Sequence, residues 1–150
     1  MIDCYLVGNI GAQGADGNED QLFAASFEDL VNKAAVVTHN YDIQLEKWKS
    51  GEHSNTTMVS ITDSYLPKFQ ELITIAKKLN TPEKFEDVRD LYLKSLDSEL
   101  QSNILFRNNL VSVNATETML SSKLYSDALR YEIESFRAFE SAVSKTNNDS

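Results

Sequence analysis

Apolar residues recur every three or four positions through most of the chain, which is the spacing of one face of an α-helix. The first run predicts a helix over about 19–50. Asn18 with Gln21 fits a capping box at its start, and Gly51 is a typical helix stop. The apolar positions of this helix are Phe23, Phe27, Leu30, Ala34, Val37, Tyr41, Leu45 and Trp48.

A second apolar stripe, from Met58 to Leu79, predicts another helix. Pro67 falls inside it, and proline removes a backbone donor and clashes with the carbonyl four residues back, at Asp63. We expect a kink there, or a helix that restarts at Leu66 after a short preceding segment. A bend that wraps the helix around the core is favoured over a bulge that opens a pocket.

Two further helices complete the pattern. Thr81 and Pro82 fit an N-cap and a first helical position, so a helix is expected from there to about 111. Asn114 followed by Glu117 repeats the capping signature, and the last helix carries a double apolar stripe. Because the connections are short and no segment reads as a strand, the sequence predicts an all-α fold, an antiparallel up-down-up-down four-helix bundle. Its expected parts are an N-terminal arm over 1–18, the bundle over 19–146 and a C-terminal tail over 147–150.

Glycine occupies every third position near the start of the chain, at Gly8, Gly11, Gly14 and Gly17. Phosphate-binding loops need a different glycine order after a strand, and collagen needs many more repeats together with proline. We therefore expect a flexible glycine-rich arm. The candidate contact of this arm with a partner consists of Tyr5, Leu6 and Val7.

The charge balance narrows the range of partners. The chain has 14 Lys and Arg against 23 Asp and Glu, a net charge of −9. Nucleic-acid backbones are bound by clustered basic residues, whereas here only Lys77 and Lys78 are adjacent, so no nucleic acid is expected as a partner. No apolar run reaches the length that a bilayer requires, so we expect no direct membrane span.

The sequence contains no recognisable catalytic or metal-binding motif. Its single cysteine, Cys4, has no basic neighbour in sequence, and the Glu-x-x-His pairs of ferritin-like bundles do not occur. His39 and Asp42, three residues apart, form a weak candidate pair for a surface metal ion. We expect no enzymatic activity, no cofactor and no resident metal.

Two glutamates, Glu99 and Glu132, fall at or beside the apolar stripes. Burial with a raised pKa is one reading. The favoured reading is that each reaches water or pairs with an arginine at the edge of the core. The arginines available for such pairs are Arg107, Arg130 and Arg137.

Small polar side chains interrupt the apolar faces of the third and fourth helices, at Ser95, Ser98, Ser102, Asn103, Ser121, Ser135 and Ser141. Close helix packing through small residues is the favoured reading, and a small-molecule pocket within the bundle is the alternative. The residues predicted for such a pocket are Tyr65, Pro67, Tyr92 and Tyr131.

Three Asn-x-Ser/Thr triplets begin at Asn55, Asn114 and Asn148, in predicted turns or the tail, where a glycan is tolerated. Asn114 has the N-cap as its alternative role. The three triplets favour an extracytoplasmic location over a cytoplasmic one.

The run LNTPEKFEDVRDLYLKSLDSELQSNILFRNNLVSVNATE, with the later LYSDALRYEIESFRAF, resembles uncharacterised helical proteins of ammonia-oxidising archaea. The resemblance implies an extracytoplasmic setting and an accessory role in a membrane-associated complex, and it supplies no site residue. The leading hypothesis is therefore a non-enzymatic protein-interaction module that contacts a protein partner or a second copy of itself. A sensor-type bundle that binds a small molecule is the alternative.

Overall fold

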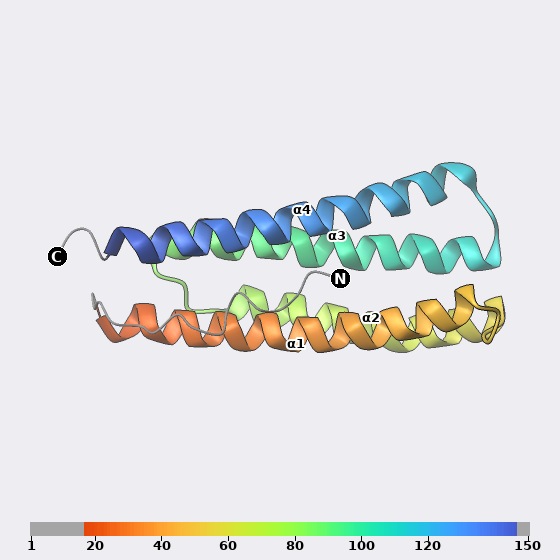
Figure 1. The fold of residues 1–150 in the computed structure, drawn as a ribbon, viewed down its shortest axis with the longest axis horizontal. Coiled ribbons are helices and arrows are strands. Elements are labelled where there is room, and N and C mark those ends of the chain that lie inside the picture. Colours follow the sequence, from red (N-terminus) through yellow and green to blue (C-terminus); the bar gives the residue numbers. More distant parts are fainter. Residues whose placement is uncertain (1–16, 147–150) are drawn as a thin grey trace.

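The structure is a computed structural model, and it describes residues 17–146. Its helices are α1 (Gly17–Lys49), α2 (Asn55–Lys78), α3 (Glu86–Val111) and α4 (Ala115–Thr146), with a short 3₁₀ turn, η1 (Glu83–Phe85), before α3. Figure 1 shows them as long neighbouring rods, with the chain reversing its direction at each connection. The predicted all-α four-helix bundle is confirmed.

Aromatic rings form one end of the bundle core. The ring of Phe27 on α1 meets Tyr92 of α3 edge-on, with centroids 5.3 Å apart, and stacks on Phe139 of α4 at 5.4 Å. Phe23 stacks on Phe85 at 4.6 Å. Offset and edge-on aromatic pairs bind one another beyond the area that they bury, so these rings link α1 to the second hairpin.

Small polar residues join α3 to α4, as the packing reading predicts. Ser95 donates a hydrogen bond to the backbone oxygen of Ala128 at 2.7 Å, and Ser102 and Ser121 donate to each other's backbone oxygens at 2.8 and 2.9 Å. Ser135 donates to a backbone oxygen of α3 at 2.7 Å. Side chains this small let the two helices approach closely, and each hydroxyl is satisfied by the opposite backbone.

Helix α1 lies farther from the second hairpin than α2 does. Helix α3 packs against both α2 and α4, whereas no Cα atom of α1 lies within 8 Å of one in α3 or α4. Large side chains such as Phe27 bridge this wider space at one end of the bundle. Farther along, the same space is left open as a cavity.

Two of the predicted helix ends are confirmed. Gly51 adopts a φ of +84°, a backbone conformation that side chains disfavour, and its N–H donates to Trp48 O at 3.0 Å. The side chain of Asn114 accepts from the backbone N–H groups of Thr116 at 3.0 Å and Glu117 at 3.4 Å, so Asn114 caps α4.

Other predicted ends are wrong. Helix α1 already includes Gly17 and Asn18, so Asn18 lies inside the helix and is not its cap. Thr81 donates its hydroxyl to Leu79 O at 3.0 Å and caps nothing, because the chain turns through η1 before α3 begins at Glu86. Local signals mark a helix end only where the tertiary path of the chain agrees with them.

Pro67 lies within an uninterrupted α2, so the alternative of a helix that restarts at Leu66 is wrong. The proline is exposed to solvent. The arm, the tail and the candidate residues Tyr5, Leu6, Val7 and Asn148 lie outside the described residues. Within 17–146, no helix combines the length and the apolar character that a membrane crossing demands.

Candidate functional site

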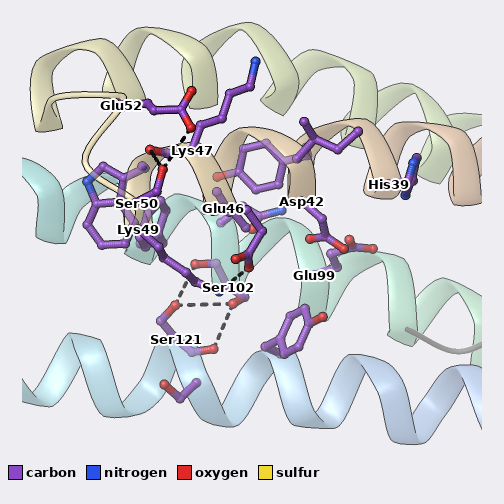
Figure 2. Close-up of a pocket in the computed structure, with 18 of the residues that line it drawn as sticks. His39, Asp42, Glu46, Lys47, Lys49, Ser50, Glu52, Glu99, Ser102 and Ser121 are labelled. Atoms are coloured by element: carbon purple, nitrogen blue, oxygen red, sulfur yellow. Dashed lines mark hydrogen bonds and ion pairs between the residues drawn. The ribbon is translucent and has the colours of Figure 1, made fainter.

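Two adjoining cavities lie between α1, α3 and α4, with volumes of about 1080 and 460 Å³. They share His39, Asp42, Glu99 and Tyr125 as lining residues, so we treat them as one site, the acidic cavity. Figure 2 shows its larger part, in which the side chains of Asp42 on α1 and Glu99 on α3 converge. The site sits where α1 is separated from the tightly joined α3 and α4.

Glu99 is the central acid of the cavity. Its Oε1 accepts a hydrogen bond from the hydroxyl of Thr38 at 3.0 Å, across the space between α1 and α3. Burial raises the pKa of Glu99 to about 7, against the opposing effect of the Thr38 hydrogen bond, and the negative charges of Glu132 and Asp42 raise it further. Glu99 is therefore part neutral and part ionised near neutral pH.

The expected pairing of the buried glutamates with arginine is wrong. Arg107 forms its ion pair with Asp63, at 2.8 Å, and Arg130 pairs with Asp127, at 3.1 Å. Burial raises the pKa of Glu132, as it does for Glu99. The alternative reading from the sequence, burial with a raised pKa, is the one that the structure supports.

Asp42 and Tyr125, two further titratable groups of the cavity, share this electrostatic environment. Burial raises the pKa of Asp42, and Lys49 lowers it by a smaller amount. Burial also raises the pKa of Tyr125, with additional effects from the negative charges of Asp42, Glu99 and Glu132. In the described part of the chain, none of these three carboxylates forms an ion pair. The cavity is lined by five acidic side chains and two lysines, so its net charge is negative. They are Asp42, Glu46, Glu52, Glu99 and Glu132, with Lys47 and Lys49.

Asn103 lies one helical turn after Glu99 on α3 and lines the same cavity. Its side chain is only 7% exposed, and its Nδ2 has no hydrogen-bond partner. A buried amide without a partner is uncommon, because it forfeits the hydrogen bonds that water would give it in the unfolded chain. Asn103 therefore has unused hydrogen-bonding capacity at the wall of the cavity.

Aromatic side chains form the far end of the larger cavity. The rings of Trp48 and Phe106 meet edge-on with centroids 5.1 Å apart, and both line the cavity. The indole N–H of Trp48 is already engaged, since it donates to Asn55 Oδ1 at 2.9 Å. The two rings therefore offer an apolar surface in a cavity wall that also holds Lys47, Lys49 and Glu52.

The structure does not gather the four residues predicted for a pocket. Tyr92 is buried and lines the smaller part of the acidic cavity. Tyr65 and Pro67 belong to α2, where Tyr65 packs on Tyr41 with centroids 5.2 Å apart. The guanidinium of Arg130 lies over the ring of Tyr131, with its central carbon 4.4 Å from the ring centroid.

Sequence reasoning named several residues that line the cavity, among them Ser95, Glu99 and Asn103, but did not predict that they share one site with Asp42. One signal for this grouping is present. Ser95, Glu99 and Asn103 follow one another at intervals of four along α3, which places them on one face of the helix. Leu96 and Leu100 continue the apolar core beside this polar row. A polar row next to a buried stripe indicates a cavity only when the facing helix stands away from it.

Within residues 17–146, no three His, Cys, Asp or Glu side chains are grouped closely enough to hold a metal ion. Glu99, with a pKa near 7, has the proton affinity that general acid–base chemistry requires. The cavity nevertheless shows no activated nucleophile beside it among the described residues. No protein-family model, curated protein or solved structure matches this chain. Fold and site together define an all-α four-helix bundle with an acidic cavity inside it.

A second surface feature lies at the α3–α4 turn, where α4 diverges from α3 at one end of the bundle (Figure 1). Four large apolar side chains are exposed there, and we call them the apolar tip. They are Val111 at 66%, Val113 at 90%, Met119 at 74% and Leu120 at 45% exposure.

Proposed function

We propose that this protein is a ligand-binding four-helix domain that holds a small molecule in the acidic cavity. The observation that carries the proposal is the buried Nδ2 of Asn103, which has no hydrogen-bond partner and lies one helical turn from Glu99 on the cavity wall. Ligand pockets typically combine an apolar lining with a few polar groups that fix the orientation of the ligand. Here the rings of Trp48 and Phe106 supply apolar lining, and the polar row along α3 supplies the groups that would orient the ligand.

The energetics support a ligand more than a purely structural role. Burying an acid without a cation is costly, and the penalty appears as the raised pKa of Glu99. A sequence selected only for stability would gain from an apolar residue at such a position. A bound molecule that completes the hydrogen bonds and offsets the charge would recover this energy.

A thermal-shift screen of chemically diverse metabolites on the full chain tests the proposal, because a molecule that binds only the folded state raises its melting temperature. Ser126→Trp fills the cavity from α4 and is expected to abolish the shift caused by any cavity ligand. Ser60→Trp is the matched control on α2, because both serines are exposed and donate to the carbonyl four residues earlier. If no compound stabilises the chain, or if every stabilising compound acts equally on Ser126→Trp, the proposal fails.

The apolar tip favours a second candidate function, a protein-interaction module that associates with a second copy of the chain. Its exposed residues lie close together in sequence, and Glu117 is the one charged residue between Val111 and Leu120. Exposed apolar patches of this kind mark interaction sites. Sedimentation equilibrium should then show a dimer that Val113→Asp converts to a monomer. A chain that is monomeric at every concentration tested rules out this form of interaction.

The proposed setting is extracytoplasmic, in an accessory role beside a membrane-associated complex. This part of the proposal rests on the sequence resemblance and on the triplets at Asn55, Asn114 and Asn148. Externally added protease should degrade the protein in intact cells while sparing a cytoplasmic marker. Protection equal to that of the cytoplasmic marker would place the protein inside.

A further inference from the structure

We infer that the acidic cavity binds an elongated organic cation, an amine whose ammonium group lies between Asp42 and Glu99 and whose apolar body extends toward Trp48 and Phe106. The inference rests on the proposed ligand-binding function and specifies the chemical class of the ligand. Four independent features of the cavity carry it: its charge, its unpaired amide, its aromatic end and its lack of metal-binding geometry.

Acidic side chains reach the cavity from all three helices that surround it, and they outnumber the lysines of its lining, Lys47 and Lys49. Asp42 is on α1, Glu99 on α3 and Glu132 on α4, and all three line the cavity. They repel one another, since the charges of Glu132 and Asp42 both raise the pKa of Glu99. A positive charge bound among them would attract all three carboxylates and offset their mutual repulsion. An anionic ligand would increase the repulsion, and a neutral one would leave it unchanged.

Asn103 adds a hydrogen-bonding group that does not depend on charge. It lines the cavity one turn from Glu99, and neither the described backbone nor any described side chain satisfies its Nδ2. Rotation about the end of the side chain exchanges its nitrogen and oxygen, so the amide offers either a donor or an acceptor. An ammonium group carries several N–H donors, and one of them can reach the amide oxygen while another binds the carboxylate of Glu99.

The aromatic end specifies the rest of the molecule. Trp48 lies six residues after Asp42 on α1, which corresponds to about 9 Å along the helix axis. The paired rings of Trp48 and Phe106 line the cavity there, in a wall that also includes Glu46, Lys47 and Lys49. Tyr41 and Tyr125 also line the larger cavity, and aromatic faces attract organic cations. A linear amine fits this arrangement, because its ammonium group would lie beside the carboxylates and its alkyl body beside the rings.

A metal ion fits the same cavity poorly. Hard cations such as Mg²⁺ and Ca²⁺ require six or more oxygen ligands close around them. The described residues provide no group of three acids or histidines with that proximity. The carboxylates are instead distributed along a cavity with a volume of about 1080 Å³ in its larger part, which suits an extended molecule.

The test compares three probes that share a six-carbon chain and differ only in the head group: hexylamine, hexanol and hexanoate. Isothermal titration calorimetry on the full chain at physiological salt should show saturable one-site binding of hexylamine and weaker or no binding of the other two. In NMR spectra the amide signals of Glu99 and Asn103 should shift with hexylamine. Salt at this level screens the general attraction of a cation to an acidic protein.

Two variants locate the binding. Glu99→Gln removes the central charge, and a lost charge-assisted hydrogen bond should weaken hexylamine by about tenfold or more. Asp97→Asn alters an exposed acid on the same helix that does not line the cavity. At pH 8, where Glu99 is mostly ionised, it makes nearly the same change in net charge and should leave the affinity unaltered. Hexylamine affinity should also rise between pH 5.5 and 8, because Glu99 ionises in that range. The other titratable or charged groups that line the cavity are His39, Tyr41, Asp42, Glu46, Lys47, Lys49, Glu52, Tyr92, Tyr125 and Glu132.

Two kinds of outcome overturn the inference. The first is hexylamine binding that Glu99→Gln and Asp97→Asn weaken equally, which would indicate general charge attraction. The second is hexanol or hexanoate binding as tightly as the amine and shifting the same NMR signals. That second result leaves the ligand-binding function standing and rejects only the cationic class, whereas the failure of every compound in the metabolite screen rejects the function itself.

Discussion

Glu99→Gln should make the protein more stable at alkaline pH and should remove much of its pH dependence. Glutamine has nearly the same shape as glutamate, and its side-chain oxygen can still accept the hydrogen bond that Thr38 donates at 3.0 Å. What the substitution removes is the charge that the cavity disfavours. The variant therefore isolates the electrostatic penalty of this one acid.

The sign and size follow from proton linkage. In the folded protein the pKa of Glu99 is raised from 4.5 to about 7, mainly by burial. Between these two values the folded state holds a proton that the unfolded state has lost, so the stability of the wild type falls as the pH rises. The total loss, complete above about pH 7, is about 3 kcal/mol, taking 1.36 kcal/mol for each pH unit between the two pKa values. Below the unfolded pKa the contribution of Glu99 vanishes.

Urea unfolding followed by circular dichroism, at pH values from 5 to 8, measures this loss of unfolding free energy directly. The wild type and Glu99→Gln should have similar unfolding free energies at pH 5, and the variant should be more stable by about 3 kcal/mol at pH 8. Asp42 and Glu132, whose pKa values are also raised, are present in both proteins and cancel in the difference. Parallel pH profiles for the two proteins would refute the argument that Glu99 is buried without a compensating charge.

Three further predictions concern the fold. Ser135→Ala removes a fully buried hydroxyl that donates to Val88 O at 2.7 Å, and should lower the unfolding free energy by about 1–2 kcal/mol in urea titration; an unchanged value would mean that the hydroxyl does not hold α4 on α3. Asn114→Ala removes the N-cap of α4 and should lower the unfolding free energy by about 1 kcal/mol, with Asn114→Asp restoring most of it. Gly51→Ala should lower the melting temperature by several degrees, because φ of +84° strains any residue with a Cβ; an unaltered melting temperature in calorimetry would contradict this.

The apolar spacing was sufficient to predict the helices, because a stripe at helical spacing must be buried to contribute stability and four such stripes can bury one another. The stop at Gly51 and the cap at Asn114 were predictable for a similar reason, since both depend on local backbone geometry. The start of α3 was not, because Thr81 and Pro82 carry the local signal for a helix while the chain there must first cross from one hairpin to the other.

The sequence by itself determined that this chain forms four amphipathic helices, since burial of periodic apolar residues is a property of each segment. It also placed small serines where α3 and α4 meet. Only the tertiary structure decided that α4 lies close to α3 while α1 stands apart from both. That unequal spacing leaves a gap in which Asp42 of α1 faces Glu99 and Asn103 of α3 across one acidic cavity. The distance between two helix axes depends on all the side chains between them, and no local pattern encodes it.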